Sequence, residues 1–255
     1  MPDPLFIVCA AAAAILIGLS KSGFAASLGA VAVPLLAMVM PTPQAAGMTL
    51  PLLLVLDAAA LVIYRREVDW RIFRIVIPGA MAGTLIGWAL SAVVDESVVG
   101  LLLGIMSVVF ALDAWLPLRK KLETVPASRP WGWFWGTVAG FTSFISHTGG
   151  PPYQVYTMPL RLAPNIYAGT AAVVFAVVNV SKLYPYYVLG QLSVSNLELA
   201  AALLPVAGLS MLAGIWLVRR VPAHIFYHIA YGLIFLLGLK LIHDGVADLF
   251  LTAPV

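Results

Sequence analysis

GLSKSGF, residues 18–24, interrupts an apolar run that extends from Pro4 to Met40. A continuous helix over that run would be about 55 Å long, because an α-helix rises about 1.5 Å per residue. The hydrocarbon core of a bilayer is only about 30 Å thick, so a helix of this length has to break. The small and polar residues around Lys21 mark the break. A lysine inside an otherwise apolar segment is also the first indication of a binding site.

The composition of the whole chain is that of a membrane protein. Of its 255 residues, 62% are hydrophobic and only 10% are charged, whereas charged residues make up about a quarter of a soluble domain. Several apolar stretches reach the roughly 20 residues that a membrane-spanning helix needs. These stretches are continuously apolar rather than alternating, which argues against a β-barrel. The composition therefore predicts an all-α polytopic membrane protein.

Charge and motif content exclude several function classes. The net charge of +3 comes from basic residues near the ends of apolar segments, so no nucleic-acid partner is expected. The single cysteine, Cys9, excludes an intrachain disulfide, and the histidines have no metal-ligand spacing. No phosphate-binding loop or nucleotide fingerprint occurs, so we expect no cofactor and no ATP-driven transport by this chain alone.

The chain has the same order of segments twice. The first broken segment precedes expected helices near 43–64, 71–94 and 97–117. A second overlong segment, 131–162, is interrupted by SHTGGPP at 146–152 and precedes expected helices near 164–188, 196–218 and 223–243. A shift of 122 residues pairs Gly18 with Gly140, Gly47 with Gly169, and Tyr64 with Tyr186, and a shift of 127 pairs Pro78 with Pro205, Gly87 with Gly214, and Leu90 with Leu217. Repeated broken helices are typical of secondary transporters.

Charge predicts that the two repeats, residues 1–122 and 123–255, are inverted. If each broken segment is a re-entrant pair of half-length helices, followed by three full crossings, the basic residues share one face of the membrane. They are Arg65, Arg66, Arg71, Arg74, Arg119, Lys120, Lys121, Arg129, Arg161, Arg219 and Arg220. The opposite face receives Asp3, Asp95, Glu96, Glu198, Asp244 and Asp248. The positive-inside rule then places 119–130 in the cytoplasm and both termini outside, with a bacterial inner membrane as the expected location. Two short full crossings per segment give the same charge distribution and remain an alternative.

The two breaks contain the residue types that bind an anion. Helices that begin inside the membrane direct free N–H groups and a partial positive charge at the site, and glycine permits close approach of the backbone. The first break supplies Ser20, Lys21, Ser22 and Gly23. The second break supplies Ser143, Ser146, His147, Thr148, Gly149 and Gly150. Together they predict a substrate site for a small oxyanion.

The intramembrane charges each have two interpretations. Lys21 either binds the substrate or forms an ion pair with Asp57, and the two are compatible. Asp57 is also a candidate proton carrier. Lys182 either contacts the substrate or snorkels outward, and its position in the first repeat is occupied by Ala60.

Two neutral side chains complete the predicted site. Asn179, the repeat equivalent of Asp57, either binds substrate or bonds between helices. His147 can relay protons, because an imidazole titrates near neutral pH, or it is a packed, hydrogen-bonded histidine. We expect Asp57 and His147 to couple transport of the anion to movement of a proton or another ion.

Four stretches resemble a known family. GLSKSGFAASLGAVAVPLLA, PQAAGMTLPLLLVLD, GFTSFISHTGGPPYQVYTMPLRL and YAGTAAVVFAVVNVSKLYPYYVLGQL are similar to the TauE/SafE family of membrane permeases, the sulfite exporters. The resemblance extends over essentially the whole chain, and HTGGPP and NVSKLYPY are its most specific parts. It implies transport of sulfite, sulfonates or related organosulfur anions with proton or ion coupling.

The sequence therefore predicts a secondary transporter of small, sulfur-containing anions that works by alternating access. A passive anion channel is the alternative, and its flux would not respond to a proton gradient. An enzyme would need a nucleophile–base pair, and the adjacent Ser146 and His147 do not face each other in a helix. The expected partners are the anion, membrane lipids and further copies of the chain.

Overall fold

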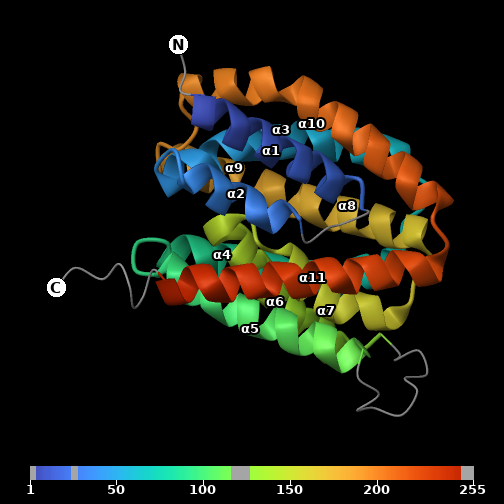
Figure 1. The fold of residues 1–255 in the computed structure, drawn as a ribbon. Helices are drawn as coiled ribbons and strands as arrows, with labels where there is room; N and C mark the ends of the chain where they lie inside the picture. The colour runs from blue at the N-terminus through green and yellow to red at the C-terminus, as the bar shows by residue number, and fades with distance from the viewer. Residues whose placement is uncertain (1–3, 24–27, 116–126, 248–255) are drawn as a thin grey trace.

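The computed structural model describes residues 4–23, 28–115 and 127–247, and these are helices joined by short connections (Figure 1). The first part contains α1 (Pro4–Lys21), α2 (Gly29–Ala37), α3 (Thr42–Ile63), α4 (Trp70–Leu90) and α5 (Glu96–Trp115). The second contains α6 (Arg129–Ser146), α7 (Gly150–Thr157), the 3₁₀ helix η1 (Met158–Leu160), α8 (Pro164–Ser181), α9 (Leu183–Val188), α10 (Val194–Arg220) and α11 (Ala223–Val246). Asp3, Asp248 and residues 119–126, to which the sequence assigned membrane faces, lie outside the described residues.

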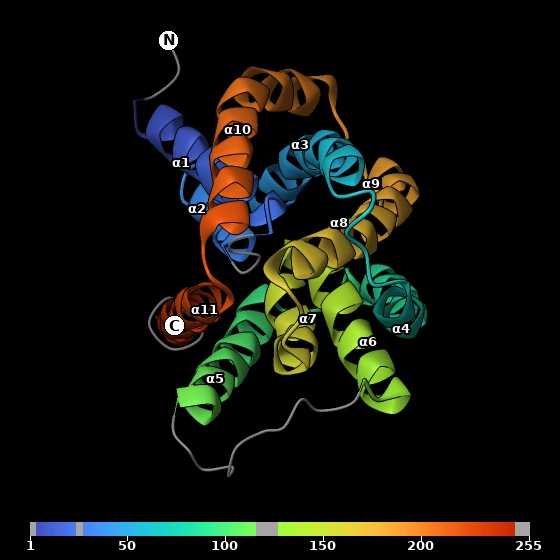
Figure 2. The same cartoon turned by 90° about the vertical axis from the view of Figure 1, so that its right-hand side faces the viewer.

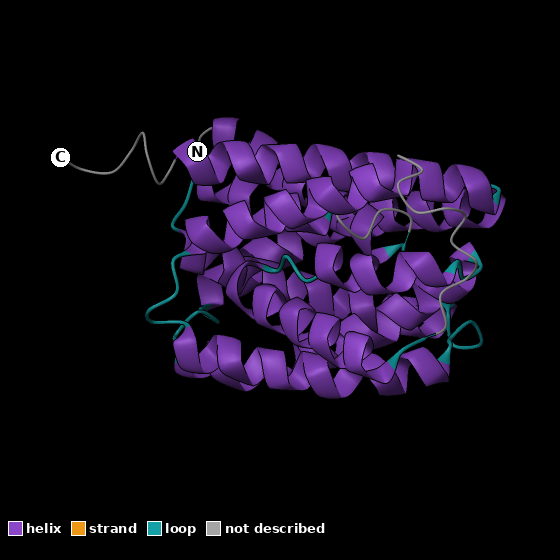
Figure 3. Ribbon diagram, turned by 90° about the horizontal axis from the view of Figure 1, so that it is seen from below, coloured by secondary structure: helices purple, strands orange, loops and turns teal. Residues whose placement is uncertain are grey.

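The membrane class is confirmed. Six helical stretches in the described part of the chain are long and apolar enough to cross a bilayer. The axes of most helices are roughly aligned, and most connections lie at the two ends of the bundle (Figure 3). Large apolar side chains such as Val62, Leu209 and Leu236 are exposed on the outside of the helices, where lipid would cover them.

Both predicted breaks are present, but their arms are unequal. In the first, α1 has 18 residues and α2 has 9; in the second, α6 has 18 and α7 has 8. The expected pair of half-length helices is therefore wrong. The long arms measure about 27 Å and the short arms about 12–14 Å. Each break lies near the middle of its apolar run, and the second arms are short because α2 ends at Ala37 and α7 ends at Thr157, before η1. Each short arm returns toward the end of the bundle at which its long arm began, and the two hairpins enter from opposite ends (Figure 1).

The ends of the helices follow the charge pattern. The start of α1 and the end of α11 lie at one end of the bundle, whereas the ends of α3, α5 and α10 and the start of α6 lie at the other (Figure 1). The second end carries Arg65 and Arg66 after α3, Arg129 at the start of α6, and Arg219 and Arg220 at the end of α10.

One segment that the sequence predicted as a single helix forms two helices, α8 and α9. The segment predicted as a single helix near 164–188 breaks at Lys182, whose N–H donates to the carbonyl of Asn179 at 3.2 Å. Pro185 explains the break, because proline lacks an N–H and its ring clashes with the carbonyl four residues earlier, that of Ser181. Lys182 lies between the two helices, and its side chain is buried.

The two halves of the chain interlock. Helix α4 packs chiefly on α6, and α10 packs chiefly on α1, so each half contributes a helix to the bundle of the other (Figure 2). Glycine permits both contacts: a Cβ on Gly140 would lie 1.9 Å from the carbonyl oxygen of Ala80, and a Cβ on Gly18 would lie 2.2 Å from that of Ala207. Small residues at such contacts let helix backbones approach closely within a membrane.

Two tyrosines tie the breaks to neighbouring helices in matching ways. The Tyr64 hydroxyl donates to the carbonyl of Ser22 at 2.7 Å, and the Tyr186 hydroxyl donates to the carbonyl of Phe144 at 2.9 Å. Each pair is 42 residues apart, and the 122-residue shift converts the first pair into the second. Both tyrosine side chains are buried.

Candidate substrate-binding site

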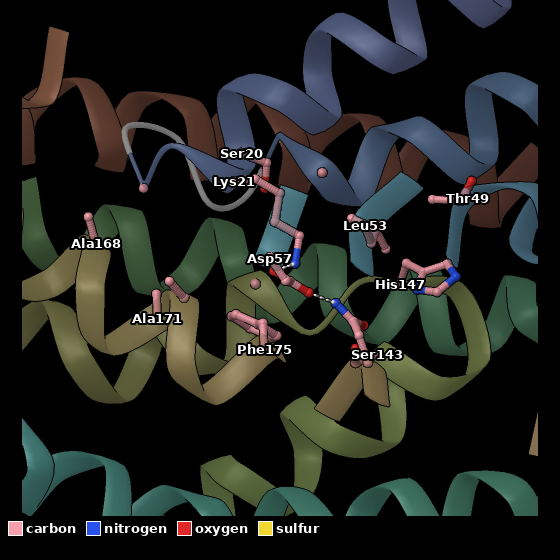
Figure 4. A pocket seen from close by; sticks show the side chains of 15 residues that line it. Ser20, Lys21, Thr49, Leu53, Asp57, Ser143, His147, Ala168, Ala171 and Phe175 are labelled. Atoms are coloured by element: carbon pink, nitrogen blue, oxygen red, sulfur yellow. Dashed lines mark hydrogen bonds and ion pairs between the residues drawn. The ribbon is translucent and has the colours of Figure 1, made fainter. Parts of the chain in front are cut away.

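The two breaks meet at one cavity near the centre of the protein. Its volume is about 50 Å³, larger than the roughly 10–15 Å³ that a single water molecule requires. Figure 4 shows side chains from both halves of the chain around it. The lining residues are Ser20, Lys21, Gly23, Gly29, Thr49, Leu53, Asp57, Ser143, His147, Gly150, Ala168, Ala171, Ala172, Phe175 and Asn179. This set includes the first residue of each short helix, Gly29 of α2 and Gly150 of α7.

Helical periodicity positions two walls of the cavity. Helix α8 contributes Ala168, Ala171, Ala172, Phe175 and Asn179, and α3 contributes Thr49, Leu53 and Asp57. Spacings of three and four residues place these side chains on one face of each helix. The three alanines leave space in the cavity, whereas Asn179 and Asp57 bring polar groups to it.

An ion pair lies at the wall formed by the first break. Lys21 Nζ is 2.5 Å from Asp57 Oδ1, and the two side chains are 10% and 2% exposed. Nζ also lies 5.8 Å from the centre of the Phe175 ring. The aspartate is on α3, so the pair holds the end of α1 against the core. Removing either partner would leave a charge buried without its partner.

A hydrogen-bonded chain continues from this pair into the second half. Asp57 Oδ2 accepts from Asn179 Nδ2 at 2.7 Å, and Asn179 Oδ1 accepts from Lys182 Nζ at 3.0 Å. Lys182 Nζ also donates to Ser143 Oγ at 2.7 Å and lies 3.1 Å from His147 Nδ1. The interpretation that Lys182 snorkels outward is wrong, because the residue is fully buried. Lys182 lies behind the wall, since its three partners line the cavity and it does not.

His147 has an unusual backbone conformation that directs its ring inward. It follows the last residue of α6 with φ of 56° in the left-handed region, a conformation that costs about 1–2 kcal/mol for a residue with a Cβ. The ring Nε2 lies 3.2 Å from the carbonyl of Ala46 and 3.4 Å from the hydroxyl of Tyr186. If Lys182 donates to Nδ1, the ring is neutral and its single proton on Nε2 is directed at Ala46.

The structure brings together only part of the predicted site. Of the residues in the two breaks, the cavity is lined by Ser20, Lys21, Gly23, Ser143, His147 and Gly150, and the residues outside its lining are Ser22, Ser146, Thr148 and Gly149. The Ser22 hydroxyl donates to the carbonyl of Leu19, and the hydroxyls of Ser146 and Thr148 are hydrogen-bonded to each other at 2.9 Å. A Cβ on Gly149 would lie 2.6 Å from the Ala139 carbonyl oxygen. These four residues shape the breaks.

Several residues of the site were not among those expected from the sequence. Thr49 and Phe175 line the cavity, and Tyr186 contacts His147. Helical periodicity counted back from Asp57 would have indicated Thr49, which lies two turns earlier on the same face. Counting back from Asn179 would likewise have indicated Phe175, and the repeat alignment already pairs Tyr186 with Tyr64.

Comparison with known proteins identifies the family. No curated protein and no solved structure matches the chain. The family model described as sulfite exporter TauE/SafE matches residues 10–241, a range that includes both breaks and every residue of the cavity. The resemblance seen in the sequence is confirmed, and with it the class of a transporter rather than an enzyme. The chain belongs to the sulfite exporter TauE/SafE family, and it is a multi-pass membrane transporter of sulfur anions.

Proposed function

We propose that this protein is a secondary transporter that carries sulfite, sulfonates or related organosulfur anions through the central cavity by alternating access. One observation carries the proposal: two chain breaks from different halves of the sequence line the same cavity, together with a lysine. Irregular backbone inside a membrane is tolerated where it is buried in protein or lines a cavity. Substrate sites of secondary transporters are formed by such breaks near the middle of the bilayer.

The residues around the cavity supply donors for an oxyanion. Lys21 offers a charged ammonium group, and Ser143 and Asn179 offer a hydroxyl and an amide from the second half. The first residues of α2 and α7, Gly29 and Gly150, bring two helix N-termini to the same space. At α7 only Gly150 offers a free N–H among the first three residues, because Pro151 and Pro152 have none. The dipole of each helix favours negative charge at these ends.

Inverted repeats are the structural basis that we propose for alternating access. Three features support this arrangement: the hairpins enter from opposite ends of the bundle, the α1–α10 contact matches the α6–α4 contact, and the two tyrosine hydrogen bonds are related by the 122-residue shift. In this proposal residues 1–122 and 123–255 are the two repeats. Rocking one repeat against the other would open the cavity first to one side and then to the other.

Asp57 and His147 are the proposed coupling residues. An anion that binds Lys21 competes with Asp57 for the ammonium group, because both would accept its hydrogen bonds. The released carboxylate can then take up a proton, so that anion and proton travel together. His147 contacts both the cavity and the buried ammonium of Lys182, which gives it a position from which to exchange a proton with the site.

The charge pattern sets the proposed orientation. The basic ends of α3 and α10 would face the cytoplasm, and both termini would lie outside, in a bacterial inner membrane.

Flux measurements in proteoliposomes test the function. Sulfite, sulfate, thiosulfate, taurine and sulfoacetate are compared, with and without an imposed proton gradient. We expect saturable transport of at least one sulfur anion that changes with the gradient and is reduced by Lys21→Met. Flux that ignores the gradient would favour a passive channel, and absence of flux for the whole panel would contradict the proposal.

A further inference from the structure

The buried charges around the cavity do not balance. Counted in their ionised forms, Lys21 and Lys182 are positive and Asp57 is negative. Lys21 and Asp57 neutralise each other in their 2.5 Å pair. Lys182 has no carboxylate beside it in the described part of the chain, since its hydrogen-bond partners are all neutral groups. When Lys182 is protonated, one positive charge is therefore buried without a counter-charge.

The contacts of Lys182 suit an ammonium group. An ammonium has three protons to donate, and Nζ has three partners in three directions: Ser143 Oγ, His147 Nδ1 and Asn179 Oδ1. These bonds satisfy the donors and leave the charge uncompensated. Burial of a charge without an opposite charge is costly, so an anion in the cavity would stabilise the protonated form of Lys182.

The cavity is where that negative charge can lie. All three partners of Lys182 line it, so the ammonium is one side chain away from the cavity. Ser143 accepts from Lys182 through its oxygen and therefore keeps its own proton to donate. Asn179 uses one amide proton for Asp57 and has a second. A ligand in the cavity would receive hydrogen bonds from groups that Lys182 polarises.

We propose that Lys182 makes this cavity selective for monovalent anions, such as hydrogen sulfite and alkylsulfonates, over divalent ones such as sulfate. The inference rests on the proposed function and adds the charge of the substrate. Before Asp57 takes up a proton, a monoanion leaves the group of three side chains and ligand neutral. A dianion leaves one negative charge buried, and an uncharged ligand leaves the positive charge uncompensated. Asp57 sets this balance, because it cancels the charge of Lys21.

Methanesulfonate and sulfate are suitable probes, because both are tetrahedral sulfur oxyanions and they differ by one unit of charge. Their affinities are measured on the full-length protein in detergent by calorimetry. The wild type should bind methanesulfonate about tenfold more tightly than sulfate, and Lys182→Met should weaken methanesulfonate binding by about tenfold or more. Asp57→Asn adds one net positive charge and should shift the preference toward sulfate by about tenfold.

Lys240→Met is the matched control, because Lys240 pairs with Asp244 on α11, away from the cavity. It should change neither affinity. Thermal unfolding shows which variants are folded. If Lys182→Met does not fold, the ratio of methanesulfonate to sulfate affinity in the wild type, and the shift of that ratio in Asp57→Asn, still decide the outcome. Equal affinities for the two anions in the wild type, or an unchanged ratio in folded Asp57→Asn, would overturn the inference. Failure to bind or transport any sulfur anion would instead contradict the proposed function.

Discussion

Asp57 and Asn179 lie 122 positions apart and are joined by a 2.7 Å hydrogen bond between Asp57 Oδ2 and Asn179 Nδ2. The shift of 122 is the same one that aligns the two halves of the sequence. In the proposed arrangement of inverted repeats, a position that contacts its own equivalent would lie next to the axis relating the two copies, as at a two-fold interface between subunits. The pair is not chemically symmetric, because one member is charged and the other is neutral. The charge of Asp57 is met by Lys21, whereas its equivalent Asn179 accepts from Lys182.

Lys21→Met separates the two roles of Lys21. Loss of the ammonium should weaken substrate affinity by about 1.5–3 kcal/mol, or roughly ten- to hundredfold. It should also destabilise the fold by about 3 kcal/mol, because Asp57 remains buried without its partner. Adding Asp57→Asn should restore the thermal unfolding midpoint but not the affinity. Full recovery of affinity in the double variant would mean that Lys21 serves only as half of the ion pair.

Tyr64→Phe and Tyr186→Phe test the matched contacts. Each change removes one hydroxyl-to-carbonyl hydrogen bond, and we expect each to lower the free energy of unfolding by about 1 kcal/mol. If the two bonds hold opposite sides of the cavity closed, each variant should admit solvent from a different side. A single cysteine at Ala172, in a Cys9→Ala background, is labelled in vesicles of each orientation. Labelling that increases from the same side in both variants would contradict the idea that the two hydrogen bonds close opposite sides of the cavity.

Gly140→Ala and Gly18→Ala test the interlocked helices. An added Cβ would lie 1.9 Å from the Ala80 carbonyl oxygen in the first variant and 2.2 Å from that of Ala207 in the second. Because backbone has to move in both cases, we expect a loss of at least about 1–3 kcal/mol in unfolding free energy. Gly208→Ala is the control, since a Cβ there meets nothing within 4 Å and alanine favours helix by about 1 kcal/mol. Equal midpoints for all three variants would exclude these contacts.

A cysteine at Ala127, two residues before Arg129 at the start of α6, reports the orientation of the bundle. In a Cys9→Ala background we expect an impermeant thiol reagent to label it only from the cytoplasmic side, because basic residues are retained there. A cysteine at Ser193, before α10, should be labelled only from the outside. Labelling of position 127 in intact cells would reverse the proposed topology.

Features that depend on local chemistry could be predicted from the sequence. The length of the apolar runs required two breaks, and the glycines and polar residues at GLSKSG and SHTGGPP located them, so α1 ends at Lys21 and α6 at Ser146 as expected. The correspondence of Tyr64 with Tyr186 could also be predicted from the sequence, through the 122-residue shift. These features need only helix length, bilayer thickness and residue type, which are properties of short segments.

The tertiary structure alone decided which side chains meet. Hydropathy does not specify how far a helix rotates about its axis, so a lysine such as Lys182 was equally consistent with the lipid face and the interior. Tertiary packing buries it, with its Nζ donating to Ser143 on α6. Nor does hydropathy specify partners, because α1 could pack on α4 of its own half as readily as on α10 of the other. The cavity, the Lys21–Asp57 pair and the burial of Lys182 all arise from that packing, because they join residues up to 122 positions apart that touch only after the halves have interlocked.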